Sequence, residues 1–261
     1  MLAMAEVRRI SPAERDSLAG LLDPRSVADA LPTYYALTHP ADRVTLYGYY
    51  HAPTIPSGFL VLARTGFDLF RPLAVPFVAT PGGLSRLLAA GIEAGRPVIL
   101  TLPVEQREWV QEVAEFGSPV VLDLLRVDGR SYSPLLNVLV VEVTAPGGLP
   151  RYEIRSGGVA HAAAGLNWIG DLYAEVYLET SPEAAGKPYG KSVLSAITGR
   201  LLAEGKVALL RLEEGNVAGH VDAYEIGFRR TGERSLVGQA MLKDSSPIPR
   251  TGLGAANLGL S

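Results

Sequence analysis

The chain lacks cysteine altogether, although it has 261 residues. Disulfides, thiolate metal sites and cysteine nucleophiles all require this residue, so none of them can contribute to the fold or the chemistry. The four histidines, His39, His51, His161 and His220, show no spacing typical of metal ligands. We therefore expect no metal site.

Positive charge is also sparse. The formal net charge is −3, and no segment combines a lysine and arginine block with interleaved aromatic residues. Proteins that bind nucleic acid usually carry such a patch, so we expect no nucleic-acid partner. No run of about 18 apolar residues exists for a membrane span, and the first residues are too charged for a signal peptide. We expect a cytoplasmic protein with no membrane partner.

Apolar residues, by contrast, make up 48% of the chain, which is ample for buried cores. A length of 261 residues exceeds the usual size of one domain, so two domains of about 110 to 140 residues are expected. The segment VDGRSYSP, at 127–134, has the turn composition of a boundary. It divides the chain into residues 1–134 and 135–261.

A weak internal repeat favours the same division. The segment Gly95–Gly117 is similar to Gly205–Gly227, and in each a glycine is followed by a strand, a polar turn, a helix and a second glycine. A glycine at that final position typically ends a helix. A strand and an apolar helix precede each copy. Few identities support the repeat, so a coincidental βαβα similarity stays the alternative.

The loop after the strand Tyr173–Thr180 indicates an anion site. Pro182 stops the strand because proline cannot extend a paired strand, and a helix is predicted to begin near Lys191. The free N–H groups of its first turn and the helix dipole favour phosphate. Lysines flank the loop, and glycines let it turn: Lys187, Lys191, Gly186 and Gly190. The ligand should be a phosphorylated cofactor.

Two cofactor classes compete for this loop. A nucleotide P-loop requires G-x-x-x-x-G-K-[ST], and Gly190-Lys191-Ser192 supplies its end, but Ala185 stands where the first glycine is required. The segment Ala185–Gly190 also resembles the pyrophosphate loop of the GNAT superfamily of N-acyltransferases, whose pattern is Arg/Gln-x-x-Gly-x-Gly/Ala. It keeps the last glycine but has Ala185 for the arginine and Pro188 for the middle glycine.

A second motif favours the GNAT resemblance. Asn216-Val217-Ala218-Gly219 followed by Ala223–Phe228 is similar to the family pattern Asn-x-Ala-Ser…Ala-Glu-x-x-Gly-Phe after the fifth strand. The resemblance covers roughly residues 150–240. It implies a mixed α/β sheet of the GNAT type, with two related units in tandem. The first unit would be degenerate, because Thr80-Pro81-Gly82-Gly83 is too short to wrap a pyrophosphate and has no lysine.

The resemblance also implies a reaction and a set of site residues. Acetyl-CoA would donate its acetyl group to an unidentified small amine or protein amine, which attacks the thioester directly. Glu175 is the candidate general base and Glu179, on the same face of the strand, the reserve. The residues expected to bind the cofactor lie on the strand, the loop and the next turn: Leu178, Glu179, Thr180, Gly186, Lys187, Tyr189, Gly190, Lys191, Ser192 and Asn216.

Other interpretations stay open at this point. Glu175 could pair within the sheet, and Asn216 is at least as well explained as the N-cap of a helix. Trp168 and Asn167 could line an acceptor pocket, from a turn between two strands. Tyr224 is displaced by one residue from the position of a family acid and is expected to pack. A protein that binds acetyl-CoA without catalysis, or a nucleotide-binding enzyme, are the alternative functions.

Overall fold

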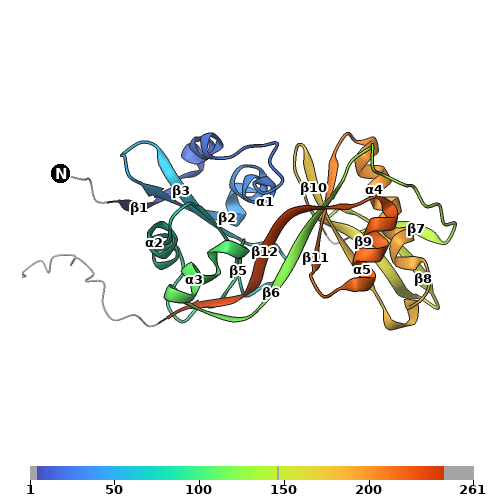
Figure 1. Cartoon of the computed structure of the whole chain (residues 1–261). Helices are drawn as coiled ribbons and strands as arrows, with labels where there is room; N and C mark the ends of the chain where they lie inside the picture. Colours follow the sequence, from blue (N-terminus) through green and yellow to red (C-terminus); the bar gives the residue numbers. More distant parts are fainter. Residues whose placement is uncertain (1–4, 146, 244–261) are drawn as a thin grey trace, which may run out of the picture.

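The computed structural model describes residues 5–145 and 147–243, which form one twelve-stranded mixed sheet with helices packed on it (Figure 1). The strands are β1 (Glu6–Ile10), β2 (Val44–Tyr50), β3 (Pro56–Ala63), β4 (Leu73–Val78), β5 (Val98–Pro103), β6 (Ala114–Val127), β7 (Val140–Thr144), β8 (Pro150–Ser156), β9 (Val159–Ile169), β10 (Tyr173–Thr180), β11 (Val207–Glu213) and β12 (Arg229–Leu242). Their order in the sheet is β1-β2-β3-β4-β5-β12-β6-β11-β10-β9-β8-β7. The predicted mixed α/β class is confirmed.

Helices connect the strands in both halves of the chain. The α-helices are α1 (Ala30–Thr33), α2 (Pro81–Gly91), α3 (Arg107–Val113), α4 (Tyr189–Ala203) and α5 (Val217–Ile226). The short 3-10 and π turns are η1 (Pro12–Leu21), η2 (Tyr34–Thr38), η3 (Ala41–Arg43), η4 (Val104–Gln106) and η5 (Pro182–Ala184). The order β4-α2-β5-α3 in the first half matches β10-α4-β11-α5 in the second, as the repeat predicts.

The two long strands, β6 and β12, cross between the halves (Figure 1). The end of β6, at Leu122–Val127, pairs with β11 of the second half. The end of β12, at Ser235–Ala240, pairs with β5 of the first half. The two strands also pair antiparallel with each other, from Arg229 opposite Arg126 to Leu242 opposite Ala114. Each half of the sheet is therefore completed by a strand from the other half, and the division expected at 134/135 falls in the connection after β6.

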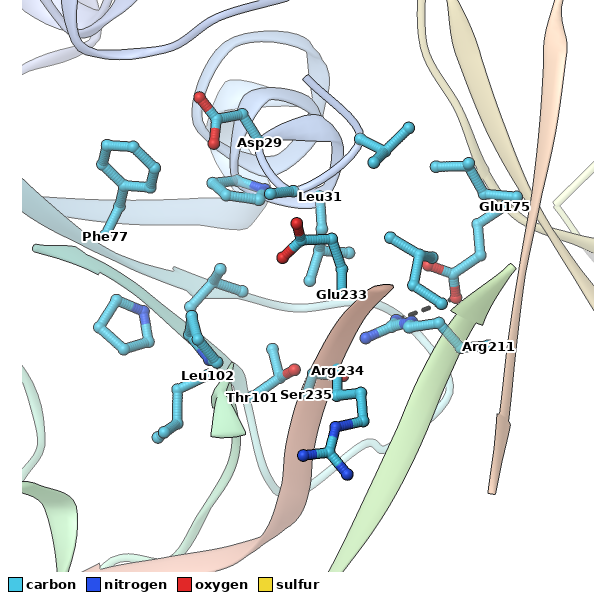
Figure 2. A pocket seen from close by; sticks show the side chains of 18 of the residues that line it. Asp29, Leu31, Phe77, Thr101, Leu102, Glu175, Arg211, Glu233, Arg234 and Ser235 are labelled. Atoms are coloured by element: carbon cyan, nitrogen blue, oxygen red, sulfur yellow. Dashed lines mark hydrogen bonds and ion pairs between the residues drawn. The ribbon is translucent and has the colours of Figure 1, made fainter. Parts of the chain in front are cut away.

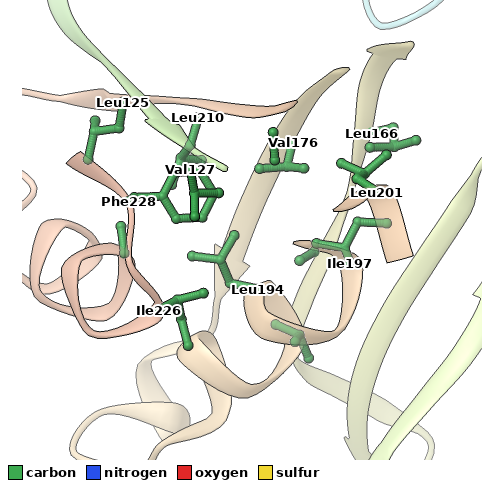
Figure 3. Packing of buried hydrophobic residues seen from close by; sticks show 14 of the residues in the cluster. Leu125, Val127, Leu166, Val176, Leu194, Ile197, Leu201, Leu210, Ile226 and Phe228 are labelled. Atoms are coloured by element: carbon green, nitrogen blue, oxygen red, sulfur yellow. The ribbon is translucent and has the colours of Figure 1, made fainter. Parts of the chain in front are cut away.

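Helices cover opposite faces of the sheet in different ways. On one face, α2 and α3 bury the first half, and α4 and α5 bury the second, where Leu194 and Ile197 pack against Val176 and Leu210 (Figure 3). On the other face, the segment 12–38 covers β2 and β3 and also reaches the second half. One hydrophobic cluster there joins residues of both halves: Tyr35, Phe59, Val75, Trp168, Tyr173 and Leu209.

Several expected boundaries differ from the structure. In the apolar run 135–143 a strand begins only at Val140, as part of Val140–Thr144, because Leu136 and Val138 are 95% and 99% exposed and have no core to pack on. Trp168 lies within β9 and not in a turn. Gly227 ends α5 with φ 105°, as expected, whereas Gly117 lies inside β6, since α3 passes directly into that strand.

Among the described residues, no helix is both long and apolar enough to cross a membrane. In the same part of the chain, no group of three or more histidines and carboxylates is arranged to hold a metal ion.

Gly227 fixes the contact between α5 and the connection after β6. A Cβ at this position would lie 1.9 Å from the Ser131 carbonyl oxygen, and its φ of 105° is unfavourable for any side chain. We expect Gly227→Ala to lower the free energy of unfolding by at least about 2 kcal/mol, measured by urea denaturation. Gly215→Ala is the control, since nothing lies within 4 Å of its Cβ. Equal stability of the two variants would contradict this packing.

Candidate active site

The parallel strands β10 and β11 separate towards their carboxyl ends. They pair only from Tyr173 to Val176 and from Val207 to Leu210. Beyond Val176, β10 continues along β9, and beyond Leu210, β11 continues along β6. The backbone groups that the two strands would have shared are left facing an opening. Ligands of open α/β sheets commonly bind beyond the carboxyl ends of parallel strands.

The corresponding opening in the first half is closed. β4 and β5 pair over two residues each, and the Gln106 side chain then donates to the Val78 carbonyl oxygen at 3.0 Å. The first turn of α2 is capped by Thr80, whose hydroxyl accepts from the Gly83 N–H at 3.2 Å. A Cβ on Gly83 would lie 2.6 Å from Val78 Cγ2. The loop is therefore tight and its helix terminus already has a partner.

In the second half a cleft opens beside the loop after β10, and we call it the loop cleft. The loop contains η5 and Gly186, with φ 73°, and α4 begins at Tyr189, two residues before the predicted start. The cleft has a volume of about 690 Å³ and lies between the loop and α5. This volume is within the range of small-molecule sites. The predicted cofactor residues that line it are Thr180, Gly186, Lys187, Gly190 and Lys191.

Other residues predicted to bind the cofactor lie elsewhere. Leu178 and Tyr189 pack against the core beneath α4. Ser192 is buried, and its hydroxyl donates to the Pro188 carbonyl oxygen at 2.5 Å, which turns it away from the loop cleft. Asn216 caps α5 by accepting from the Gly219 N–H at 2.9 Å. The inward Ser192 also disfavours a P-loop, in which this hydroxyl binds magnesium.

Two carboxylates share the loop cleft with the lysines. Lys191 Nζ pairs with Glu225 Oε2 at 2.5 Å. Asp222, on α5, faces the first turn of α4, because a Cβ on Gly190 would lie 2.4 Å from its Oδ2. Burial raises the pKa of Asp222, and the Lys191 charge opposes this rise. The positive end of α4 therefore already has an anionic neighbour.

Glu175 lies on the opposite face of β10 from α4 and is 2% exposed. Its Oε1 accepts from Asn167 Nδ2 at 2.7 Å and from Arg211 Nη2 at 2.9 Å. Its Oε2 accepts from Trp168 Nε1 at 3.0 Å. Both oxygens have partners, so Glu175 holds these three side chains in place. The reserve candidate Glu179 is exposed and pairs with Arg151 at 3.0 Å.

A cavity of about 150 Å³, which we call the junction cavity, lies where the two halves meet (Figure 2). Glu175 and Arg211 line it from the second half, and Phe77 and Leu102 line it from the first. Glu175 and Arg211 also line a second cavity of about 200 Å³. Tyr35 lines this second cavity, and burial together with the Glu175 charge raises its pKa.

Arg211 was missed by the sequence reasoning. The signal was present, since Arg211 is the single charge within the apolar strand sequence VALLRL. A second missed group is buried beside α5, where Asp123 Oδ2 contacts His220 Nε2 at 3.1 Å and Arg230 Nη2 at 2.9 Å. His220 Nδ1 also contacts the Asn216 carbonyl oxygen at 2.8 Å. These contacts tie α5 to β6 and β12.

Comparison with known proteins gives no match to a protein-family model and none to a curated protein. Solved structures do match. A tandem GNAT protein from the clavulanic acid biosynthesis pathway superposes with a TM-score of 0.58 at 12% identity, covering 91% of this chain and 98% of that one. The chain has the GNAT fold. The resemblance predicted from the two motifs is thus confirmed for the fold.

Two further structures agree over most of their length. An acetyltransferase from the GNAT family of Colwellia psychrerythraea has a TM-score of 0.57 at 13% identity, covering 91% of this chain and all of that one. A GCN5-related N-acetyltransferase from Kribbella flavida has a TM-score of 0.57 at 16% identity, covering 82% and 96%. At these identities the likeness is one of fold.

Asp222 gives a test of the loop cleft. If the loop cleft holds the phosphates of acetyl-CoA, as the resemblance implies, Asp222→Asn removes a negative charge beside the helix terminus and should raise the affinity for acetyl-CoA by roughly two- to tenfold, measured calorimetrically at pH 7. The wild-type affinity should rise as the pH falls through the pKa of Asp222, because protonation removes the same charge. This rise should begin above the usual range of an aspartate, since burial raises this pKa.

Asp222→Asn also serves as the control for the pH effect, because its affinity should not show this dependence on pH. Weaker binding by Asp222→Asn than by the wild type would show that this carboxylate does not face the phosphates.

Proposed function

We propose that the protein is an N-acyltransferase that transfers an acetyl group from acetyl-CoA to a primary amine. This proposal rests mainly on one observation: β10 and β11 separate at a point that has a hollow on each side of the sheet. The loop cleft lies on the face of α4 and α5, and the junction cavity lies on the opposite face, where Glu175 and Arg211 point. The GNAT fold supports the reaction class by analogy.

The loop cleft is the proposed site for the pyrophosphate of acetyl-CoA. The N–H groups of the first turn of α4 and the Lys187 ammonium can hold phosphate oxygens. Gly190 lets the start of α4 lie close to Thr180 and Asp222, because a Cβ there would be 3.1 Å from Thr180 Cγ2 and 2.4 Å from Asp222 Oδ2. The unpaired edges of β10 and β11 offer N–H and C=O groups to the amides of the pantetheine arm. Acetyl-CoA is a substrate here and supplies the activated thioester.

The reaction is a direct transfer. The amine nitrogen attacks the thioester carbonyl carbon, a C–N bond forms and the C–S bond breaks. CoA leaves as a thiolate, and the proton lost by the nitrogen is returned to it to give the thiol and the N-acetyl product. A thiolate is a good leaving group near neutral pH, since a thiol has a pKa of about 8.5. The protein mainly has to bring the two substrates together.

Glu175 stays the proposed base, since it lies at the point where β10 and β11 part. Its oxygens accept from three side chains, so an amine or a water must replace one of these donors to reach it. Glu179 is the weaker candidate, because it is exposed and paired with Arg151.

A non-catalytic protein that binds acetyl-CoA is the second candidate. The pairing of Glu175 with Arg211 favours it, and so does the Asp222 carboxylate beside the terminus of α4. Release of CoA thiol in the presence of a primary amine distinguishes an enzyme from a binding protein. Binding of acetyl-CoA without thiol release from any amine would favour the second candidate.

We expect one equivalent of acetyl-CoA to bind per chain in a calorimetric titration. Gly190→Val should weaken this binding at least tenfold, because the side chain enters the space beside the α4 terminus. Gly82→Val is the matched control in the first turn of α2, where nothing lies within 4 Å of the Cβ, and it should leave the affinity unchanged. Two equivalents per chain, or an unchanged affinity of Gly190→Val, would contradict the assignment.

A further inference from the structure

Arg211, which lines the junction cavity, has a hydrogen-bond donor without a partner among the described residues. Its side chain is 19% exposed, and it makes one hydrogen bond within the described part of the chain, from Nη2 to Glu175. Its Nε is buried and has no partner among the described residues. A buried N–H of a charged group without an acceptor is unfavourable, and such groups commonly mark a site where a ligand supplies the acceptor.

The other cation at the cavity already has a partner. Arg234 pairs with Glu214 at 3.5 Å. In Figure 2 the guanidinium of Arg211 projects between Glu175 and the cavity, while Arg234 extends away from it. Arg211 is therefore the cation at this cavity that a ligand can reach.

Most of the remaining wall is apolar. Its apolar side chains come from α1, from the segment before it and from strands of both halves: Val27, Leu31, Phe77, Leu102, Leu124 and Leu209. A volume of about 150 Å³ is that of an apolar cavity that takes a benzene-sized group. The hollow thus combines space for one apolar group with one charged donor at its side.

The charges around Arg211 select the kind of anion. Glu175 already uses Nη2, and Glu233 and Asp29 also line the cavity. These three carboxylates would repel a doubly charged phosphate more strongly than a ligand carboxylate, which carries a single charge. A planar carboxylate also matches the donor geometry of a guanidinium.

We infer that the amine acceptor is an apolar α-amino acid, whose carboxylate accepts from Arg211 and whose side chain fills the junction cavity. This inference rests on the proposed function only because it names the ligand as the amine acceptor. Arg211 is the first residue of β11 beyond its pairing with β10. An amino group two bonds from a carboxylate held there lies beside the opening between the strands, where the thioester is proposed to sit.

The first test compares two probes in the absence of acetyl-CoA, using the full chain and calorimetry. 3-Phenylpropionate has the carboxylate and the apolar ring but no amine, and phenethylamine has the ring and the amine but no carboxylate. We expect 3-phenylpropionate to bind at least tenfold more tightly. Equal or tighter binding of phenethylamine would overturn the inference.

The second test separates Arg211 from general charge effects. Because loss of the guanidinium leaves the buried Glu175 without its cation, Arg211→Gln is combined with Glu175→Gln, and thermal melting verifies folding. This double variant should bind 3-phenylpropionate at least tenfold more weakly. Arg234→Gln removes the same charge from the same cavity and should change the affinity less than twofold. Equal weakening by both variants would overturn the role of Arg211.

Arg211→Lys provides a further check, because it keeps a cation beside Glu175 but lacks the Nε donor. It should also lose at least tenfold in affinity for 3-phenylpropionate, and wild-type affinity in this variant would contradict the inference.

A measurement of turnover then tests whether the junction cavity binds the acceptor of the reaction. With acetyl-CoA present, thiol release should be at least tenfold faster with L-phenylalanine than with L-phenylalaninamide, which lacks the carboxylate. Thiol release at equal rates with both would keep the acyltransferase and overturn the acceptor class. Binding of 3-phenylpropionate by a chain that does not bind acetyl-CoA would keep the Arg211 site and overturn the proposed function.

Discussion

The antiparallel pairing of β6 with β12 is the interaction on which the rest of the structure depends. Both strands have 14 residues and run from one half into the other. Their register shifts between Arg230 and Arg234, where the Thr231 hydroxyl donates to the Leu124 carbonyl oxygen at 2.9 Å. Gly232, with φ 93°, permits the bend. This irregularity lies at the junction cavity and directs Glu233 towards it (Figure 2).

The exchange of strands explains why neither half is a complete unit. In the second half, the described residues between β7 and β8 contain no helix, so they provide no cover for the sheet face. The first half supplies that cover. Tyr34 stacks on Trp168 with ring centroids 5.1 Å apart, and the Tyr173 hydroxyl donates to the Arg25 carbonyl oxygen at 2.6 Å. The side of the sheet that holds Glu175 is thus built by both halves.

Local signals predicted local features well. The strand Tyr173–Thr180 has the predicted bounds, because its side chains favour a sheet and Pro182 ends it. Asn216 was predicted to bind the cofactor, with an N-cap role as an equally good alternative from its position between a strand and a helix, and the structure shows the cap. The left-handed Gly227 followed from the same reasoning. In each case the relevant interaction joins residues only a few positions apart.

The sequence did not predict features that depend on pairing between residues far apart in the chain. The exchange of β6 and β12 joins residues more than 100 positions apart, and no local pattern determines that register. The contacts of Glu175 were equally inaccessible, since they require knowledge of which face β10 turns towards the first half. Asp222 was missed for the same reason, because its place in the loop cleft is apparent only when its neighbours are known.

If the protein has the proposed function, its two ligands meet different charges in the two hollows beside β10 and β11. In the loop cleft, phosphate would gain the α4 N–H groups and Lys187 but would meet Asp222 and Glu225. In the junction cavity, a carboxylate would gain the guanidinium of Arg211, whose Nη2 is bonded to Glu175. A site discriminates against a ligand that leaves its buried polar groups without hydrogen-bond partners. Selectivity should therefore arise mainly on the acceptor side, while the neutral pantetheine amides between the strands contribute much of the affinity for acetyl-CoA.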